Sequence, residues 1–354
     1  MRPVIIGGGL AGAAAGIDLA RAGHAPLLLE REREPHNKIC GEFLSGEAVA
    51  ALSALGQDVR ALGAVPITRV ELWAGSRTAA ARLPFPAVSL SRRVLDWALL
   101  GTAQQAGVTV ERGTHVRSLD DLDGPILLAS GKHDVRGHPR PPGRDEIGFK
   151  QYFAAPALAQ QLAGTVRVVF FDGGYAGLQP VEGGRLNLCL LVDGPHYRDL
   201  GDWSALLARL CREPGLAALA AATPLLSRPL AISRVPYGHL ARPAGDGVWR
   251  LGDQAAVIPS FCGDGMAIAL ESGRMAAAML AAGAGADAYQ AALLARTRRP
   301  VRLAMAGLGI ARHPLGRLAA LAGLSAVPGA LALLARLTRV ADPGRADPGR
   351  LASA

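Results

Sequence analysis

The chain has 354 residues, of which 50% are hydrophobic and 19% are charged, and its formal net charge is +9. This length allows a large core and more than one domain, and the composition excludes an intrinsically disordered chain. Most of the excess charge is arginine scattered along the sequence, and aromatic residues make up only 5%, so we expect no nucleic-acid binding.

The first thirty residues predict a nucleotide-binding βαβ unit. A strand at Pro3–Ile6, a small-residue helix at Ala13–Ala22 and a strand at Leu27–Leu29 surround the spacing G-x-G-x-x-G. The first glycine of that spacing permits a tight turn, the second leaves room for a pyrophosphate at the helix N-terminus, and the third lets helix and strand approach. Glu30 stands where a carboxylate accepts hydrogen bonds from a ribose diol. The expected contacts are Gly7, Gly9, Leu10, Ala11, Gly12, Glu30 and Arg31.

The four cysteines, at positions 40, 189, 211 and 262, are far apart and show no metal-ligand spacing. We therefore expect reduced thiols in a cytoplasmic protein and no metal site. The chain leads directly into its first strand without a basic segment or cleavage site, so we expect no secretion signal.

The middle of the chain predicts a second, antiparallel sheet. Segments 66–81, 147–154, 166–180 and 185–194 have strand character, and residues 205–222 form a helical excursion among them. The Pro/Gly-rich loop at residues 137–146 suits a domain boundary.

A second glycine-rich turn follows the apolar strand at residues 248–251. The sequence "GDQAAVIPSFCGDGMAIAL", from Gly252, opens a helix at Met266. It presents another helix N-terminus, whose N–H groups can bind an anionic or carbonyl edge, and Asp253 can bond to hydroxyls.

Four segments together resemble the FAD-dependent superfamily of p-hydroxybenzoate hydroxylase-like monooxygenases and geranylgeranyl reductases. They are the Val4–Glu30 fingerprint, "KICGEFLSGEAV" from Lys38, "LSRRVLDWAL" from Leu90, and the turn after Gly252. The resemblance implies that the fingerprint binds the ADP half of FAD, and that the ribityl chain and ring contact Asp253, Pro259, Gly263, Gly265 and Met266. It selects Arg92 rather than Arg93 as a flavin contact, because the family's arginine stands four residues before an aspartate. It also assigns Val116 to the adenine.

The same resemblance implies an α/β fold with a Rossmann-type FAD-binding domain, an inserted antiparallel-sheet substrate domain and a helical C-terminal region. The FAD-binding domain would comprise residues 1–60, 88–136 and 246–310, and the substrate domain residues 61–87 and 137–245. NAD(P)H is implied as a transient electron donor, since no second complete fingerprint is present. His133 and Asp134 are interpreted as part of a loop that helps to hold FAD, with Arg136 as the anion contact.

Three functions remain open on this resemblance. The favoured one is a monooxygenase that hydroxylates an apolar or phenolic small molecule through a flavin C4a-hydroperoxide. A reductase of isoprenoid double bonds and a non-catalytic flavin-binding protein are the alternatives. The prenyl reductases match best at Cys40-Gly41, but their motif aromatic-x-Trp-x-Phe-Pro aligns with residues 175–180, where Gly177 and Gln179 replace Trp and Phe. The catalytic candidates are Cys40, Glu42, Tyr175 and Gln179, with His36 as a further possible partner for a phenol.

Residues 285–340 are expected to be helical. Residues 318–335 carry no charge, with Pro328-Gly329 in the middle. Two short helices capping the substrate cavity are the preferred interpretation. A basic apolar surface on a membrane, flanked by Arg312, Arg317, Arg336 and Arg339, and a true membrane span are the alternatives. Residues 341–354 are expected to be a frayed tail. The oligomeric state is not predicted.

Overall fold

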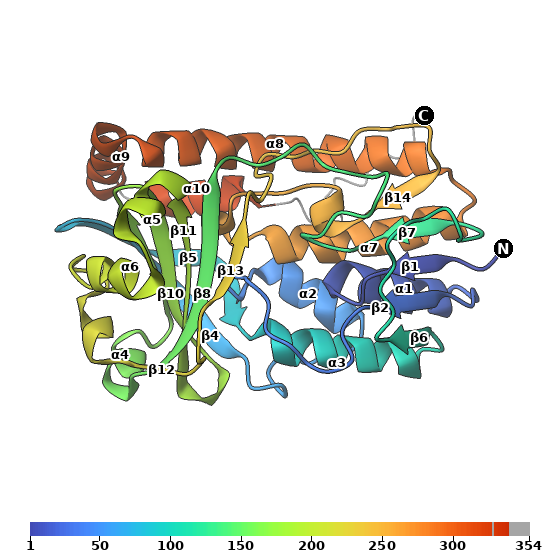
Figure 1. Cartoon of the computed structure of the whole chain (residues 1–354), viewed down its shortest axis with the longest axis horizontal. Helices are drawn as coiled ribbons and strands as arrows, with labels where there is room; N and C mark the ends of the chain where they lie inside the picture. Colours follow the sequence, from blue (N-terminus) through green and yellow to red (C-terminus); the bar gives the residue numbers. More distant parts are fainter. Residues whose placement is uncertain (328, 340–354) are drawn as a thin grey trace.

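Two β-sheets lie at opposite ends of the molecule (Figure 1). The computed structural model describes residues 1–327 and 329–339. The smaller sheet is entirely parallel, in the order β14-β7-β1-β2-β6. Its strands are β1 (Val4–Ile6), β2 (Leu27–Glu30), β6 (Thr109–Arg112), β7 (Ile126–Leu128) and β14 (Val248–Arg250).

Helices α1 (Leu10–Arg21) and α3 (Arg92–Gln105) pack on strands of the parallel sheet, while α7 (Gly265–Ala281) packs on α1 and α2 (Gly46–Ala54) packs on α7. Helix α1 lies between α3 and α7, and its alanines pack in one apolar core with both. Two glycines make this packing possible. A Cβ on Gly12 would lie 2.0 Å from the carbonyl oxygen of Gly7, and one on Gly273 would lie 2.2 Å from that of Ala11.

The larger sheet has nine strands in the described part of the chain, with the path β12-β8-β11-β10-β9-β4-β5-β3 and β13 added beside β8. Its pairs are antiparallel except for β4 with β9. The strands are β3 (Phe43–Leu44), β4 (Val65–Ala74), β5 (Arg77–Ser89), β8 (Glu146–Ala154), β9 (Thr165–Phe171), β10 (Gly174–Val181), β11 (Arg185–Asp193), β12 (Thr223–Pro224) and β13 (Leu230–Ser233).

Short helices cover the outer side of the larger sheet: α4 (Pro156–Gln161), α5 (Gly194–Leu200) and α6 (Trp203–Leu210). Leu206 and Leu210 of α6 share a core with Phe149 and Phe153 of β8. Four 3₁₀ turns complete the connections: η1 (Glu182–Gly184), η2 (Ala217–Ala221), η3 (Gly252–Gln254) and η4 (Ser260–Cys262). The other side of the sheet is thereby left to face the nucleotide-binding half.

Up to residue 339, where the described chain ends, the C-terminal region consists of three helices: α8 (Ala286–Arg312), α9 (Pro314–Ala326) and α10 (Ala330–Leu337). Helix α8 runs along the molecule from the parallel sheet to the larger sheet (Figure 1), while α9 and α10 pack on β5. In the part of the chain that the structure describes, no single helix is long and apolar enough to cross a membrane. Helices α9 and α10 together have the length and composition of a membrane span, but they are bent by 114° relative to each other. Residues 341–354, predicted as a tail, lie outside the described residues.

The structure differs from the sequence expectations at one place that matters for the site. Helix α1 begins at Leu10 rather than at Ala13, because Gly9 is extended (φ −74°, ψ −173°) and the helix starts directly after it. Strand β3 pairs with the end of β5 in the larger sheet, Phe43 with Ser89 and Leu44 with Val88. The segment before it therefore connects the two sheets.

Candidate active site

A cavity of about 830 Å³ lies between the two sheets and is bordered by residues of both, as well as by α8, α9 and α10. Helices α1 and α7 both begin at its wall, at Gly9–Ala11 and Gly263–Met266, respectively. Because neither helix has a side-chain hydrogen bond at its N-cap, their first N–H groups are available to a ligand.

The α1 end of the cavity is open where a pyrophosphate would lie. A Cβ on Gly9 would meet only the Arg92 Nη2 and Lys38 Nζ atoms, at 3.5 and 3.7 Å. At the end of β2, Glu30 is fixed by two backbone donors: Gly8 N lies 2.6 Å from Oε2, and Glu32 N lies 2.8 Å from Oε1. Its carboxylate is buried at the edge of the cavity, with its orientation already set.

Arg92 and Lys38 bring positive charge to this end and are held by one carboxylate. Asp96 accepts from Arg92 Nε at 2.6 Å, from Arg92 Nη2 at 2.9 Å and from Lys38 Nζ at 2.8 Å. Burial opposes ionisation of Asp96, but these two cations lower its pKa to about 2. Arg93 instead donates to the Pro35 carbonyl at an exposed position, and it does not border the cavity.

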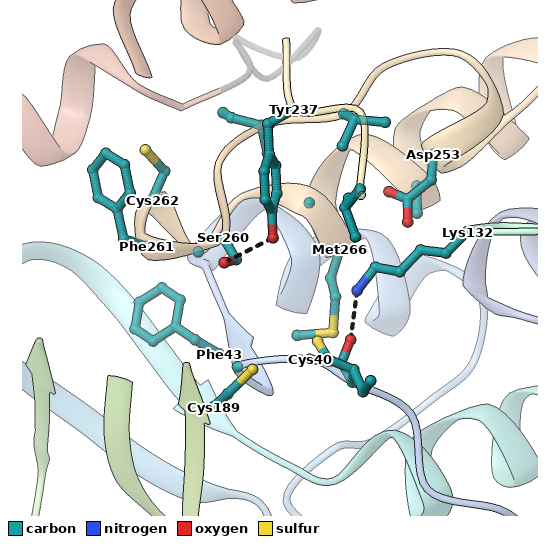
Figure 2. Close-up of a pocket in the computed structure, with 18 of the residues that line it drawn as sticks. Cys40, Phe43, Lys132, Cys189, Tyr237, Asp253, Ser260, Phe261, Cys262 and Met266 are labelled. Atoms are coloured by element: carbon teal, nitrogen blue, oxygen red, sulfur yellow. Dashed lines mark hydrogen bonds between the residues drawn. The ribbon is translucent and has the colours of Figure 1, made fainter. Parts of the chain in front are cut away.

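The α7 end is shaped by a left-handed glycine. Gly263 has φ +70°, and a Cβ there would lie 2.7 Å from the ring of Phe43. Asp264 is buried behind the turn and pairs with Arg339, 3.0 Å away. Gly265, by contrast, is open, since its nearest neighbour would be 3.9 Å from an added Cβ. Asp253 borders the same cavity and lies near Lys132 (Figure 2).

Most of the predicted cofactor residues lie on the wall of one cavity. Those that border it are Gly7, Gly9, Leu10, Ala11, Glu30, Arg31, Arg92, Val116, Asp253, Gly263, Gly265 and Met266. Gly12 and Pro259 lie behind this wall, because Gly12 packs against Gly7 and the Pro259 carbonyl closes the turn to Cys262.

The structure fits FAD on three observations. The open Gly9 and Gly265 leave space at both helix N-termini. The donor set combines backbone N–H groups, two cations and a carboxylate, which are the partners of a pyrophosphate and of sugar hydroxyls. Among the described residues, Asn37 Oδ1 at the cavity wall is buried and has no hydrogen-bond partner.

The turn at residues 40–42 is locked to the larger sheet. Glu42 has a left-handed backbone (φ +61°), which costs a non-glycine residue free energy and persists only when its surroundings hold it. Its carboxylate is completely buried and pairs with Lys150, while Tyr152 Oη donates at 2.7 and 2.9 Å and Arg92 N at 2.9 Å. Asn187 Nδ2 donates to the Cys40 and Gly41 carbonyls, at 3.2 and 3.0 Å.

Strand β10 supplies one wall of the cavity through alternate residues, Tyr175, Gly177 and Gln179. Tyr175 Oη lies 2.6 Å from Ser260 Oγ, to which Tyr237 Oη also donates at 3.3 Å. Burial raises the pKa of both tyrosines, so they keep their protons at neutral pH. Gln179 is buried, and its Nε2 has no partner in the described part of the structure.

A family model described as "FAD binding domain" matches residues 2–126. The chain is an FAD-dependent oxidoreductase. The resemblance noted in the sequence, the α/β fold class and the predicted FAD are confirmed.

Two curated reductases are similar to this oxidoreductase over most of both chains. Digeranylgeranylglycerophospholipid reductase 2 of Methanopyrus kandleri is 27% identical over 330 residues, which cover 83% of this chain and 80% of the relative. The menaquinone reductase of Mycolicibacterium smegmatis is 27% identical over 339 residues, or 80% of this chain and 77% of the relative.

Solved flavoproteins share the fold at lower identity. A flavin-dependent brominase matches with a TM-score of 0.75 and 18% identity, covering 96% of this chain and 93% of its own. PqsL of P. aeruginosa, in complex with 2-aminobenzoylacetate, matches with a TM-score of 0.70 and 20% identity, covering 92% of this chain and 100% of its own.

One part of the cavity wall of the oxidoreductase, here called the apolar arm, is lined by hydrophobic side chains. The larger sheet contributes Val70, Leu72, Leu83, Phe85, Val166, Val168 and Phe170, and helices α8, α9 and α10 contribute Leu303, Leu321, Leu324, Leu331 and Leu334. These side chains offer no hydrogen bonds, and Arg317 of α9, which also borders the cavity, is paired with Asp172, so the arm favours a hydrocarbon.

The loop after β7 borders the cavity with Lys132, His133 and Asp134, but the residue expected as its anion contact does not. Arg136 was the expected anion contact, but it is exposed and does not border the cavity, because the loop turns outward after the buried Val135. Lys132 takes the inner position, and its Nζ donates to the Ile39 carbonyl at 2.6 Å (Figure 2). Asp134 pairs with Arg140, as suits a structural loop.

Sequence reasoning missed the residues that hold the Cys40 turn, above all Lys150 and Tyr152. One signal was present: a lysine in the middle of the strand "IGFKQYFA" is a charge in an apolar run. A lysine in such a strand indicates a buried ion pair, although it does not name the partner.

Proposed function

We propose that the oxidoreductase reduces carbon–carbon double bonds of an isoprenoid chain. The observation that carries this proposal is the apolar arm, which joins the open helix N-termini to a hydrocarbon-lined space between the larger sheet and α8–α10. A polyisoprenoid chain is long and flexible and lacks hydrogen-bonding groups. It therefore matches a wall built from valine, leucine and phenylalanine.

The residues of this chain would position the double bond and supply a proton. Reduced FAD, when bound, supplies the hydride, and we propose NAD(P)H as the source of its electrons. Cys40 borders the cavity and is held in place by the hydrogen bonds of Asn187 to the backbone around it. We assign it as the proton donor. Cys189 also borders the cavity, and burial raises the pKa of its thiol to about 11.

Hydroxylation, the function favoured from the sequence, receives less support from this geometry. A phenolic substrate needs a group that accepts its proton. Glu42 is committed to Lys150 and Tyr152, and Tyr175 retains its own proton, so neither of them can accept it. His36 also borders the cavity, and burial and the nearby Lys38 lower its pKa, so it is the acceptor that remains among the candidates. The two relatives with the higher sequence identity are also named as reductases, one of a digeranylgeranyl lipid and one of menaquinone.

The test is anaerobic turnover of the FAD-loaded protein with NAD(P)H and a detergent-solubilised geranylgeranyl lipid, followed by mass spectrometry. We expect a gain of two hydrogens for each double bond and no requirement for oxygen. Cys40→Ala should lose turnover while retaining the absorbance of bound flavin, and Cys189→Ala is the matched control. A product that gains oxygen, formed only in air, would instead establish the monooxygenase.

A further inference from the structure

The C-terminal helices carry most of the large apolar side chains that the molecule exposes. Of the ten exposed large hydrophobic residues in the described chain, seven lie between residues 303 and 337. They are Leu303, Ile310, Leu315, Val327, Leu333, Leu334 and Leu337. Scattered exposed leucines are ordinary, but a concentration of this kind marks an interaction surface.

The same region is basic and contains no acid. Residues 288–339 include eight arginines and neither aspartate nor glutamate. Four of these arginines pair with carboxylates from other elements: Arg296, Arg312, Arg317 and Arg339. The other four, Arg298, Arg299, Arg302 and Arg336, are exposed, and no carboxylate of the described residues lies within ion-pair distance of them.

On α8, charge and apolar side chains share one face. Residues 299, 302, 303, 306 and 310 recur at helical spacing and are all exposed. Arginines beside leucine and isoleucine on one side of a helix are typical of segments that lie on anionic lipid.

This surface is continuous with the cavity. Leu303 and Ile310 of α8 and Leu334 of α10 border the cavity and are also exposed, at 38%, 50% and 44% of their surface. The apolar arm therefore opens among the exposed side chains of the C-terminal helices. A hydrocarbon chain could pass from a bilayer into the arm without crossing water.

We propose that this C-terminal face, formed by residues 298–310 of α8 together with α9 and α10, docks on an anionic lipid bilayer. The docked enzyme takes its isoprenoid substrate directly through the opening at Leu303, Ile310 and Leu334. The choice of a lipid substrate rests on the proposed function, whereas the docking itself rests on the charge and exposure of the face.

The test is flotation of the FAD-loaded protein with vesicles of phosphatidylglycerol or of phosphatidylcholine. We expect the wild type to float with the anionic vesicles and to be released by salt. Arg299→Gln/Arg302→Gln should weaken this partitioning by about 30-fold, since each arginine near an anionic surface contributes ~1 kcal/mol. Leu315→Ser/Leu333→Ser should also weaken it. Neither pair borders the cavity, so turnover of detergent-solubilised substrate should remain.

Matched controls lie elsewhere on the surface. Arg60→Gln/Arg228→Gln removes two exposed arginines, and Leu225→Ser removes a leucine that is 44% exposed; both should float like the wild type. Wild-type protein that stays with the soluble fraction, or C-terminal variants that float as well as the controls, would overturn the docking. The docking would also be overturned if the wild type is a dimer that binds no vesicles and Leu315→Ser/Leu333→Ser is a monomer, because a second copy of the chain would then cover the face.

The two proposals fail separately. Flotation without reduction of any isoprenoid would reject the proposed function and leave the docking. Reduction of solubilised substrate by a protein that never floats would reject the docking and leave the function.

Discussion

The buried pair between Lys150 and Glu42 gives a quantitative prediction. Both side chains are completely buried, and they join β8 to the turn that carries Cys40. Lys150→Met would leave the Glu42 carboxylate without its countercharge, which for a buried pair costs about 3–5 kcal/mol of the free energy of unfolding. Tyr152 and the Arg92 N–H would remain as donors, but they are neutral and cannot replace an ammonium group.

Urea unfolding of the FAD-free protein, followed by circular dichroism, measures this loss. The double variant Glu42→Gln/Lys150→Met removes both charges together and should recover most of the stability. Arg198→Met is the matched control, because its pair with Asp145 is 61% and 47% exposed and should contribute at most about 1 kcal/mol. The reasoning fails if Lys150→Met costs no more than this control, or if the double variant is no more stable than the single one.

Three further predictions concern the cofactor, the substrate and pH. Gly9→Ala should leave the stability of the FAD-free protein near wild type, because the added Cβ meets only the ends of the Arg92 and Lys38 side chains, at ordinary contact distance. It should weaken FAD binding in a fluorescence titration, because the methyl group projects where the pyrophosphate would lie. Gly101→Ala on α3, where an added Cβ meets nothing within 4 Å, should bind FAD normally. Gly177→Leu should add an apolar side chain at the cavity wall, where the Cβ itself has room at 3.6 Å from the Cys189 carbonyl oxygen, and should lower turnover of long isoprenoids more than that of short ones. The pKa of Asp96 is lowered from 3.8 to about 2, so its ion pairs contribute about 2 kcal/mol to the free energy of unfolding above pH 4, and this contribution disappears as the pH falls to 2. Asp96→Asn should lack this part of the pH dependence. If urea unfolding shows the same dependence of stability on pH in Asp96→Asn as in the wild type, the assignment is wrong.

The nucleotide-binding end could be predicted from sequence because its determinants are local. Gly7, Gly9 and Gly12 act within one turn, and Glu30 follows at a fixed distance along the same βαβ unit. The environment of Glu42 could not be predicted. Its partners Lys150 and Tyr152 are more than a hundred residues away, and only the register of β8 against β11 brings them under the turn.

The apolar arm could also be predicted from the sequence only in part. Alternation along β10 predicts which residues share a face, so Tyr175, Gly177 and Gln179 could be grouped in advance. What lies opposite them depends on the path of α8 and on the bend between α9 and α10, and no local pattern sets these. The sequence predicted two short helices that cap the substrate cavity, and α9 and α10 border the cavity, but their packing on β5 was not predicted.

The edge position of β14 has a consequence for biosynthesis. Strand β14 forms one edge of the parallel sheet beside β7, although more than a hundred residues separate the two in sequence. A growing polypeptide that has emerged only as far as β7 has the glycine fingerprint and lacks both the neighbouring strand and the second helix N-terminus. The site with both helix N-termini is therefore complete only after the strands from β8 to β13 have been synthesised. Premature termination within these strands would yield a fragment with an unpaired β7 edge, a natural substrate for chaperones and proteases.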